Sequence, residues 1–299
     1  MKEIRRKIIK ILPRKIYLEL LYRRLFGRKA NLNNPRLFTE KLFWLKRYYE
    51  IYMPDFIAKL HDKYTVREYV SEQIGEKYLS KIYGVFEEIK EINFDSLPKS
   101  FMLKLTKLSG RNIPCIDYNN FDKQSAIDKF EIWLKEPEKL LKTSEEGYML
   151  KGKTRIICEE SLFTHEGTTP LEFTVHCFNG KARFIAVDII LNDYKGEITG
   201  VIRNLYDMNW KLMPINFGRE RNENYLINKP DNFDELISVA EKLSKPFPYV
   251  RVDLYDIDNK IIFRELTWIP MGGNIKISPR DYDFIFGSWL ELPDKKDKV

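Results

Sequence analysis

Residues 249–273 read YVRVDLYDIDNKIIFRELTWIPMGG, a pattern that predicts two strands joined by a tight turn near residues 258–259. Alternate residues of a strand share a face, so Arg251 and Asp253 lie on the same side of the first strand. With the turn at that place, Glu265 of the second strand lies close to opposite Asp253. Two carboxylates at this spacing repel each other unless a cation lies between them.

The residues alone leave two identities open for that cation. In one, Arg251 forms a simple salt bridge with Asp253 while Glu265 faces solvent. In the other, a metal ion binds both carboxylates. Oxygen ligands without His or Cys suit Mg²⁺, and Mg²⁺ held by two carboxylates usually also binds phosphates. The second interpretation predicts a metal and phosphate site on the hairpin.

Composition places the chain among folded globular proteins. It has 299 residues, of which 43% are hydrophobic and 14% aromatic, enough for two domains or one large domain with a substantial core. Its three cysteines, Cys115, Cys158 and Cys177, are scattered and odd in number, which argues for a reducing compartment and against a disulfide framework or a zinc site. No apolar run is long enough to span a bilayer, and no signal-peptide pattern follows the basic first residues. These features predict a cytoplasmic protein.

The net charge of +7 is concentrated at the start of the chain. Residues 1–30 hold eleven Lys and Arg against two acidic residues, which leaves a mildly acidic remainder. Because nucleic-acid readers usually carry their positive patch on the folded body, we expect no nucleic-acid partner. Pro13 divides the tail into two predicted helical pieces, and Ile16, Leu20 and Leu21 can share a face of the second. Residues 1–30 therefore either contact the inner face of a membrane peripherally or form an amphipathic helix packed on the body; the second interpretation is favoured.

The rest of the chain alternates helical and strand patterns. We expect helices in residues 35–52, with Thr39 as cap, and in 62–79, 122–137 and 233–245, the last closed by Pro246. Strands are expected in 81–86, 100–106 and 155–162, and hairpins in 171–190 and 201–215, the first turning at 178–181. Helices mixed with largely antiparallel strands indicate an α+β fold.

The order of these motifs resembles the ATP-grasp superfamily. A strand lysine with a Ser/Gly loop precedes an RxIxxE strand, an EFTV…NGK hairpin, and then RVD and ELTxxP. More narrowly, the chain is similar to the TupA-like ATP-grasp proteins of cell-surface polysaccharide gene clusters, from about residue 35 to the C-terminus. That similarity rests on the segments FTEKLFWLK, DKYTVREYV…IGEKYL, CFNGKARFI, LYDMNWKLMP, AEKLSKPFPYVRVDLY and RELTWIP.

The resemblance implies two lobes with mainly antiparallel sheets. Residues 1–34 would be a basic helical extension and residues 35–157 a helical segment with the smaller lobe. Residues 158–299 would be the larger lobe, which carries the hairpin.

The resemblance also assigns roles to individual residues. Lys104 matches the strand lysine that neutralises nucleotide phosphate, and Ser109 and Gly110 belong to the loop that covers phosphates through backbone N–H groups. Glu159 and Glu160 fall at the hinge that holds adenine. The residues assigned to ATP are Lys104, Ser109, Gly110, Glu159, Glu160 and Glu172, the last at the ribose.

For the chemistry, the same resemblance names Arg251 and Lys104 as catalytic. Arg251 would stabilise charge on an acyl phosphate and on the tetrahedral intermediate. Asp253, Glu265 and Thr267 would be the magnesium ligands.

The chain departs from the family pattern at the phosphate loop. It reads LKLTKLSGRN where TupA-like proteins usually read LKCNHGSG, so Leu108 stands where a glycine is expected. A stiffer loop approaches phosphate less closely. In addition, EFTV stands where many relatives read DYKF, and Thr267 replaces the asparagine of many ATP-grasp ligases, although threonine is common in the narrow family.

The function that follows is an ATP- and Mg²⁺-dependent carboxylate–amine ligase that acts through an acyl phosphate in capsule, O-antigen or teichuronic-type polysaccharide synthesis. Its substrates would be a small-molecule or lipid-linked saccharide carboxylate and an amine. Two alternatives are a binding or scaffold subunit that no longer ligates, motivated by the altered loop, and a transferase that uses a nucleotide-sugar.

Overall fold

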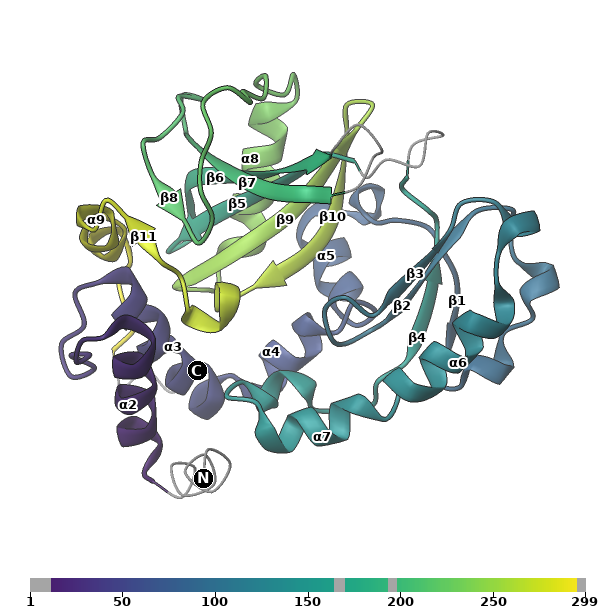
Figure 1. The fold of residues 1–299 in the computed structure, drawn as a ribbon, viewed down its shortest axis with the longest axis horizontal. Coiled ribbons are helices and arrows are strands. Elements are labelled where there is room, and N and C mark those ends of the chain that lie inside the picture. The colour runs from purple at the N-terminus through teal and green to yellow at the C-terminus, as the bar shows by residue number, and fades with distance from the viewer. Residues whose placement is uncertain (1–11, 164–169, 193–197, 295–299) are drawn as a thin grey trace.

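The computed structural model describes residues 12–163, 170–192 and 198–294. Two antiparallel sheets dominate the molecule, with helices around each (Figure 1). The helices are α2 (Arg14–Phe26), α3 (Phe38–Tyr52), α4 (Pro54–His61), α5 (Val66–Ile74), α6 (Lys123–Trp133), α7 (Glu136–Thr143), α8 (Phe233–Ser244) and α9 (Asp281–Trp289). Short 3₁₀ turns include η1 (Glu76–Tyr78), η2 (Ile89–Glu91), η3 (Phe94–Ser96), η4 (Tyr118–Asn120), η5 (Gly147–Leu150) and η6 (Pro270–Gly273).

The small sheet has the strand order β1-β4-β2-β3, from β1 (Ile82–Phe86), β4 (Ile156–Glu159), β2 (Phe101–Leu105) and β3 (Asn112–Cys115). The large sheet has the order β10-β9-β5-β6-β7, from β10 (Lys260–Thr267), β9 (Tyr249–Ile257), β5 (Glu172–Phe178), β6 (Lys181–Asn192) and β7 (Ile198–Asp207). All of these pairings are antiparallel. A third, two-stranded sheet pairs β8 (Asn216–Phe217) with β11 (Ile277–Ser278). The predicted α+β class is confirmed.

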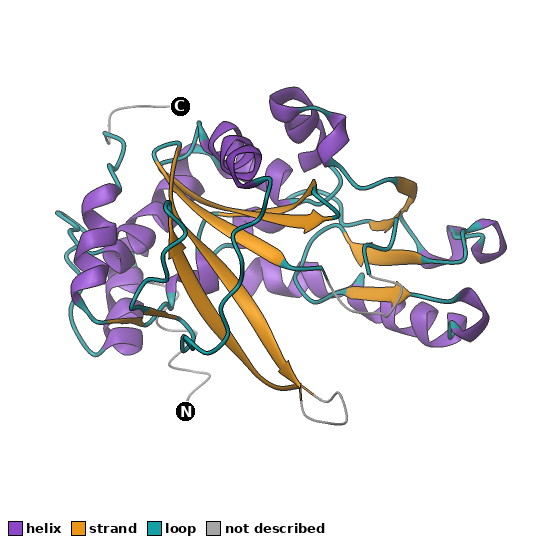
Figure 2. Ribbon diagram, turned by 90° about the horizontal axis from the view of Figure 1, so that it is seen from above, coloured by secondary structure: helices purple, strands orange, loops and turns teal. Residues whose placement is uncertain are grey.

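Each of the two larger sheets packs with its own set of helices around a separate hydrophobic core. The larger core joins the five-stranded sheet to α3, α4, α5, α8 and α9, and the smaller core joins the four-stranded sheet to α6. Figure 2 shows the five-stranded sheet as a twisted layer with α2, α3 and α9 at one end and the small lobe at the other. Residues 38–78 therefore pack with the larger sheet, although they precede the smaller lobe in sequence. The predicted boundary between residues 157 and 158 falls inside β4, which completes the small sheet.

Most predicted elements form where the residue pattern placed them, with three differences. Thr39 is not the cap of α3, because the helix begins at Phe38 and Leu37 is its N-cap residue. The carboxylate of Glu40 accepts a hydrogen bond from the backbone N–H of Leu37 (3.3 Å). Residues 201–215 form no second strand, because the return segment makes only one bridge, Tyr206 to Leu212.

The third difference concerns the buried face of α2. Ile16 and Leu20, predicted to share the packed face, are 44% and 42% exposed. Tyr17, Leu18 and Tyr22 are buried instead, in a cluster with Phe43 of α3. The predicted helical piece before Pro13 falls mostly in residues 1–11, outside the described part of the chain. Within the described residues, no helix combines the length and apolar character needed to cross a membrane.

Candidate active site

The hairpin β9–β10 brings the predicted carboxylate pair together. Its turn lies at Asp258 and Asn259, which both adopt the left-handed backbone (φ 51° and 61°) typical of a two-residue hairpin loop. The strand register then sets Asp253 opposite Glu265, as the sequence predicted, and sets Arg251 opposite Thr267.

An arginine lies between the two carboxylates. The Nε atom of Arg251 donates to Oδ1 of Asp253 (2.7 Å), and its Nη2 atom donates to the other oxygen of Asp253 and to Oε1 of Glu265 (3.2 Å). The salt bridge considered from the sequence is therefore present, but Glu265 takes part in it. Asp253 is completely buried, so this pairing compensates a charge that solvent does not reach.

A second arginine, which the sequence pattern concealed, completes the cluster. Nη1 of Arg264 lies 3.0 Å from Oε1 of Glu172, 3.6 Å from Oδ2 of Asp253 and 3.5 Å from Oε1 of Glu265. Consecutive strand residues normally face opposite ways, but the register shifts between Phe263 and Glu265. Such a bulge places two residues opposite one partner and redirects a side chain. Arg264 and Glu265 consequently serve the same site.

The two facing carboxylates titrate differently. Burial raises the pKa of Asp253, against the attraction of Arg251. Burial also opposes ionisation of Glu265, but Arg264 and Arg251 outweigh it and lower the pKa of that carboxyl to about 2. Glu265 therefore ionises at a lower pH than Asp253, whose buried charge depends on its pairing with Arg251.

The residue types at the hairpin suit Mg²⁺, but an arginine occupies carboxylate oxygens that would bind the metal. Asp253, Glu265 and Thr267 offer only hard oxygen ligands, and the side chain of Glu265 is 31% exposed toward incoming ligands. Both oxygens of Asp253 are bonded to Arg251. No group of three or more His, Cys, Asp or Glu suited to a metal occurs in residues 12–163, 170–192 and 198–294. A metal held by two carboxylates and phosphate needs no third carboxylate. The Mg²⁺ site of the hairpin therefore forms part of the proposed function.

In the small lobe, two predicted ATP residues pair with each other. Nζ of Lys104 donates to Oε1 of Glu159, and the Ser80 hydroxyl donates to Oε2 of that carboxylate (3.0 Å). Glu160 instead holds the chain just after β4, since its carboxylate accepts a hydrogen bond from the backbone N–H of Lys81 (2.7 Å). The structure thus brings Lys104 and Glu159 together across neighbouring strands and holds Glu160 at the edge of the sheet.

The loop between β2 and β3 has a fixed base and an exposed tip. Lys107 is 2% exposed, and its Nζ atom donates to the carbonyl oxygens of Leu150 (3.2 Å), Lys151 and Gly152 (2.9 Å). Ser109 and Gly110, the predicted phosphate-covering residues, are exposed. Leu108 adopts φ 70°, the left-handed conformation for which relatives supply glycine. Leu108 therefore occupies a backbone conformation that favours glycine.

Lys63 is a further cation at this site that the sequence analysis did not single out. Its Nζ atom donates to the carbonyl oxygen of Leu108 (3.0 Å), and its backbone N–H donates to the carbonyl of Thr106 (2.7 Å). Burial lowers the pKa of Lys63, while the charge of Glu265 opposes that shift. Lys63 therefore links the phosphate-loop side of the site to the carboxylate hairpin. Its position at the start of a helical pattern gave no signal of this.

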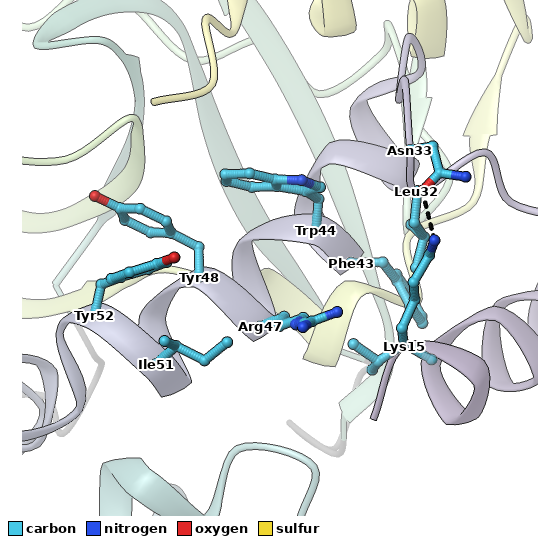
Figure 3. Close-up of a pocket in the computed structure, with 10 residues that line it drawn as sticks. Lys15, Leu32, Asn33, Phe43, Trp44, Arg47, Tyr48, Ile51 and Tyr52 are labelled. Atoms are coloured by element: carbon cyan, nitrogen blue, oxygen red, sulfur yellow. Dashed lines mark hydrogen bonds between the residues drawn. The ribbon is translucent and has the colours of Figure 1, made fainter. Parts of the chain in front are cut away.

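A separate cavity of about 200 Å³ lies between α2 and α3 (Figure 3). Trp44 and Tyr48 stack along one of its walls with ring centroids 5.5 Å apart, and Lys15 and Arg47 contribute two positive charges. None of the predicted site residues lines it. The cavity is therefore distinct from the hairpin site.

Two antiparallel lobes that present a lysine-bearing loop to an Arg–Asp–Glu hairpin are characteristic of the ATP-grasp class. The model of the TupA-like ATP-grasp family matches residues 40–291, and the chain therefore belongs to that family. No curated protein matches the sequence.

The solved structures to which the chain is similar include three ligases of low sequence identity. The D-alanine–D-alanine ligase of Bacillus anthracis is 15% identical, with a TM-score of 0.41, over 71% of this chain and 57% of that one. Phosphoribosylamine–glycine ligase of Thermotoga maritima is 11% identical, with a TM-score of 0.43, over 73% and 52%. The ATP-grasp ligase PsnB with its minimal precursor is 10% identical, with a TM-score of 0.41, over 78% and 62%. The chain thus spans between half and two thirds of the length of these proteins.

Proposed function

We propose that the protein is an ATP- and Mg²⁺-dependent carboxylate–amine ligase of cell-surface polysaccharide biosynthesis. One observation carries the proposal. Lys63 is bonded to the loop that follows Lys104 and also interacts electrostatically with Glu265 of the hairpin that holds Arg251 and Asp253. Cations on one side and a carboxylate pair on the other suit a phosphate–metal complex, because the metal bridges the anionic phosphates and the carboxylates. Membership of the ATP-grasp family supports the same assignment.

We assign a role to each of the predicted site residues. Lys104, with Ser109 and Gly110, would hold the phosphates of ATP, and Asp253, Glu265 and Thr267 would hold Mg²⁺. When bound, ATP and Mg²⁺ would supply an electrophilic γ-phosphoryl group: the acid oxygen takes it as ADP leaves, and the amine nitrogen then displaces phosphate from the acyl carbon with loss of a proton.

The remaining work of the chain is positioning and charge neutralisation. Arg251 already spans Asp253 and Glu265, and its guanidinium would stabilise the negative charge on an acyl phosphate or tetrahedral oxygen. No side-chain nucleophile is required for this chemistry.

The substrates we assign are a small-molecule or lipid-linked saccharide carboxylate and an amine. A lipid-linked acceptor agrees with a peripheral position at the inner face of the membrane. Exposed Ile16 and Leu20 beside the exposed Arg23 and Arg24 of α2 are the described residues that support such a contact.

One observation favours a second candidate, a binding subunit that does not ligate. Both oxygens of Asp253 are engaged by Arg251, and an arginine in that place can substitute for the metal altogether.

A thermal-shift panel separates these functions. ATP with Mg²⁺ should stabilise the ligase, by about 2.7 kcal/mol at 100-fold excess over Kd, whereas a nucleotide-sugar would stabilise a transferase and a scaffold would respond to neither. Lys104→Met should abolish the ATP-induced shift, because it removes the phosphate-facing charge. Lys153→Met, at an exposed lysine of the same lobe, is the matched control and should respond like the wild type. An ATP shift that survives Lys104→Met would place the phosphates elsewhere.

A further inference from the structure

The cavity between α2 and α3 has an aromatic wall built from one face of α3 (Figure 3). Trp44, Tyr48 and Tyr52 recur at every fourth residue, so their side chains lie on the same side of the helix. The rings of Trp44 and Tyr48 stack at an interplanar angle of 16°, and the ring of Tyr52 follows with its centroid 5.1 Å from that of Tyr48. The cavity therefore offers a ligand a continuous aromatic surface.

Two positively charged side chains complete the cavity, and the described residues that line it include no acid. Nζ of Lys15 donates to Oδ1 of Asn33, and the other N–H groups of this ammonium have no acceptor within the described chain. Arg47 is exposed, and no hydrogen bond or ion pair with a described residue engages its guanidinium. The cavity thus combines two positive charges with unused donors, so its electrostatic complement is an anion.

A second, more open hollow of about 570 Å³ adjoins the cavity. Trp44 and Asn33 line both spaces, so a ligand that fills one of them can continue into the other past the indole ring. In the hollow, Lys41 is already bonded to the carbonyl oxygen of Gly287 (2.8 Å), and Asp294 balances its charge. The cavity is therefore positive, whereas the hollow is close to neutral.

These features select among anionic ligands. At about 200 Å³, the cavity suits one ring-sized group. A sugar ring carries C–H groups on its faces, whose slight positive charge attracts the negative face of an indole, and it carries hydroxyl groups at its edge that accept from Lys15 and Arg47. A fatty acyl chain has no use for these donors, and an aromatic acid leaves the amides of Asn33 and Asn34 in the hollow unused.

We infer that the cavity and the adjoining hollow bind an acidic oligosaccharide. A sugar residue with a carboxylate occupies the cavity, with the carboxylate between Lys15 and Arg47 and the ring against Trp44. The next sugar residue, which is uncharged, occupies the hollow and forms hydrogen bonds with the amides of Asn33 and Asn34.

This docking site is separate from the chemistry. None of the residues assigned to ATP or Mg²⁺ is among the described residues that line the two spaces. The inference deepens the proposed function, on which it rests for the role of the glycan as the substrate or its carrier. The binding itself requires neither ATP nor Mg²⁺.

The experiment is an isothermal titration of the full-length protein, without nucleotide, with tetrasaccharides of hyaluronan, chondroitin and heparosan. In each of these, glucuronate alternates with an uncharged amino sugar. We expect at least one to bind saturably, and to bind more weakly as salt is added. Chitotetraose, which has the amino sugar but no carboxylate, should bind about tenfold more weakly, because it lacks the charge that pairs with Lys15 and Arg47.

Three variants locate the binding. Arg47→Met should weaken the affinity for the acidic glycan about tenfold and leave that for chitotetraose unchanged. Arg23→Met, at an exposed position of α2 that lines neither space, is the matched control and should bind like the wild type. Trp44→Leu keeps an apolar side chain but removes the flat ring, so it should weaken the binding of every glycan. Because Arg47 is exposed, its variant keeps the inference testable even where Trp44→Leu fails to fold.

The inference is overturned if none of the acidic tetrasaccharides binds, or if Arg47→Met binds them as tightly as the wild type. Benzoate that binds as tightly as the tetrasaccharides would make the cavity a site for aromatic acids. Vesicles of phosphatidylglycerol that bind through Arg47 while the glycans do not would assign it to a lipid headgroup. Either result also overturns the inference.

Failure of the inference is distinguishable from failure of the proposed function. A protein that is stabilised by ATP with Mg²⁺ but binds no acidic glycan refutes the docking site alone. One that binds an acidic glycan through Arg47 but does not respond to ATP refutes the ligase alone.

Discussion

At the residue scale, the hairpin places two carboxylates in different environments. Asp253 is completely buried and doubly bonded to Arg251, whereas Glu265 is partly exposed and shared between Arg251 and Arg264. Neutralising Asp253 should therefore change the free energy of unfolding by a different amount from neutralising Glu265, even if both carboxylates bind one metal ion. Because Arg251 already lies between the two carboxylates, we do not expect neutralisation of Asp253 to relieve repulsion.

We predict that Asp253→Asn lowers the free energy of unfolding by on the order of 3 kcal/mol, because it leaves the buried Arg251 without its main partner. Glu265→Gln should cost about 1 kcal/mol or less, since its ion pairs are partly solvated. Both variants should lose Mg²⁺-dependent phosphate release from ATP. Urea unfolding and a phosphate assay measure the two effects. A stable Glu265→Gln protein that turns over ATP at the wild-type rate would refute the metal assignment.

A second residue-scale prediction concerns pH. His176 is buried, with Nδ1 2.7 Å from the hydroxyl of Tyr249 and Nε2 without a partner among the described residues. Burial lowers the pKa of His176 well below its usual range, helped by the charge of Arg251. Below pH 6.5 the unfolded chain binds a proton that the folded chain does not, so stability falls as the pH falls and is unaffected above that value.

The contribution of His176 should amount to about 1 kcal/mol between pH 6.5 and 5.5. Chemical unfolding of the wild type and of His176→Phe at both pH values isolates it, because every other titrating group is shared. We expect the wild type to lose more stability than the variant over this interval. Equal losses would show that His176 is protonated in the folded protein.

At the scale of elements, irregularities in the strands and loops shape the site. The bulge in β10 turns Arg264 toward the carboxylates, and the base of the β2–β3 loop is fixed by Lys107. Lys104 and Lys107 are only three residues apart, yet Lys104 pairs with Glu159 while Lys107 donates to the carbonyl oxygens of residues 150–152.

We predict that Lys107→Met destabilises the protein by about 3 kcal/mol, because three carbonyl oxygens lose their donor in a place shielded from water. Lys99→Met, at an exposed lysine of the same lobe, should change stability by less than about 0.5 kcal/mol. Thermal unfolding without ligand measures both. If Lys107→Met melted like the control, the lysine would have a binding role and no anchoring role.

At the scale of the whole molecule, the N-terminal extension is part of the structure. Helix α2 buries Tyr17, Leu18 and Tyr22 in a cluster with α3, and Arg28 forms an ion pair with Asp283 at the start of α9 (2.8 Å). The sequence left open a membrane contact or an amphipathic helix packed on the body, and it favoured the packed helix. Packing indicates that the extension holds the two helical ends of the large lobe together.

Deletion of residues 1–30 should accordingly destabilise the protein by roughly 4 kcal/mol or more, since it removes three buried side chains and exposes their partners on α3. The double variant Arg23→Ala/Arg24→Ala, at exposed positions, should keep its stability and bind anionic vesicles less than the wild type. Calorimetry and vesicle sedimentation test the two effects. An intact melting transition after the deletion would show that the extension does not stabilise the body, and unchanged vesicle binding by the double variant would refute the membrane contact.

The sequence by itself determined the hairpin, its turn and the facing of Asp253 and Glu265. Strand alternation and turn propensity depend on neighbouring residues, so a local pattern is enough to predict them. The family motifs, likewise, identified the fold before any contact was known.

Only the tertiary structure decided which partner each charge has. The side chain of Lys63 donates to Leu108 of the phosphate loop, which lies 45 residues later in the chain. Arg264 joins the carboxylates because a bulge interrupts the alternation of inward and outward side chains along the strand, on which sequence-based prediction depends. The strength of a charge depends on burial and on through-space neighbours, and both are properties of the folded molecule that no local pattern encodes.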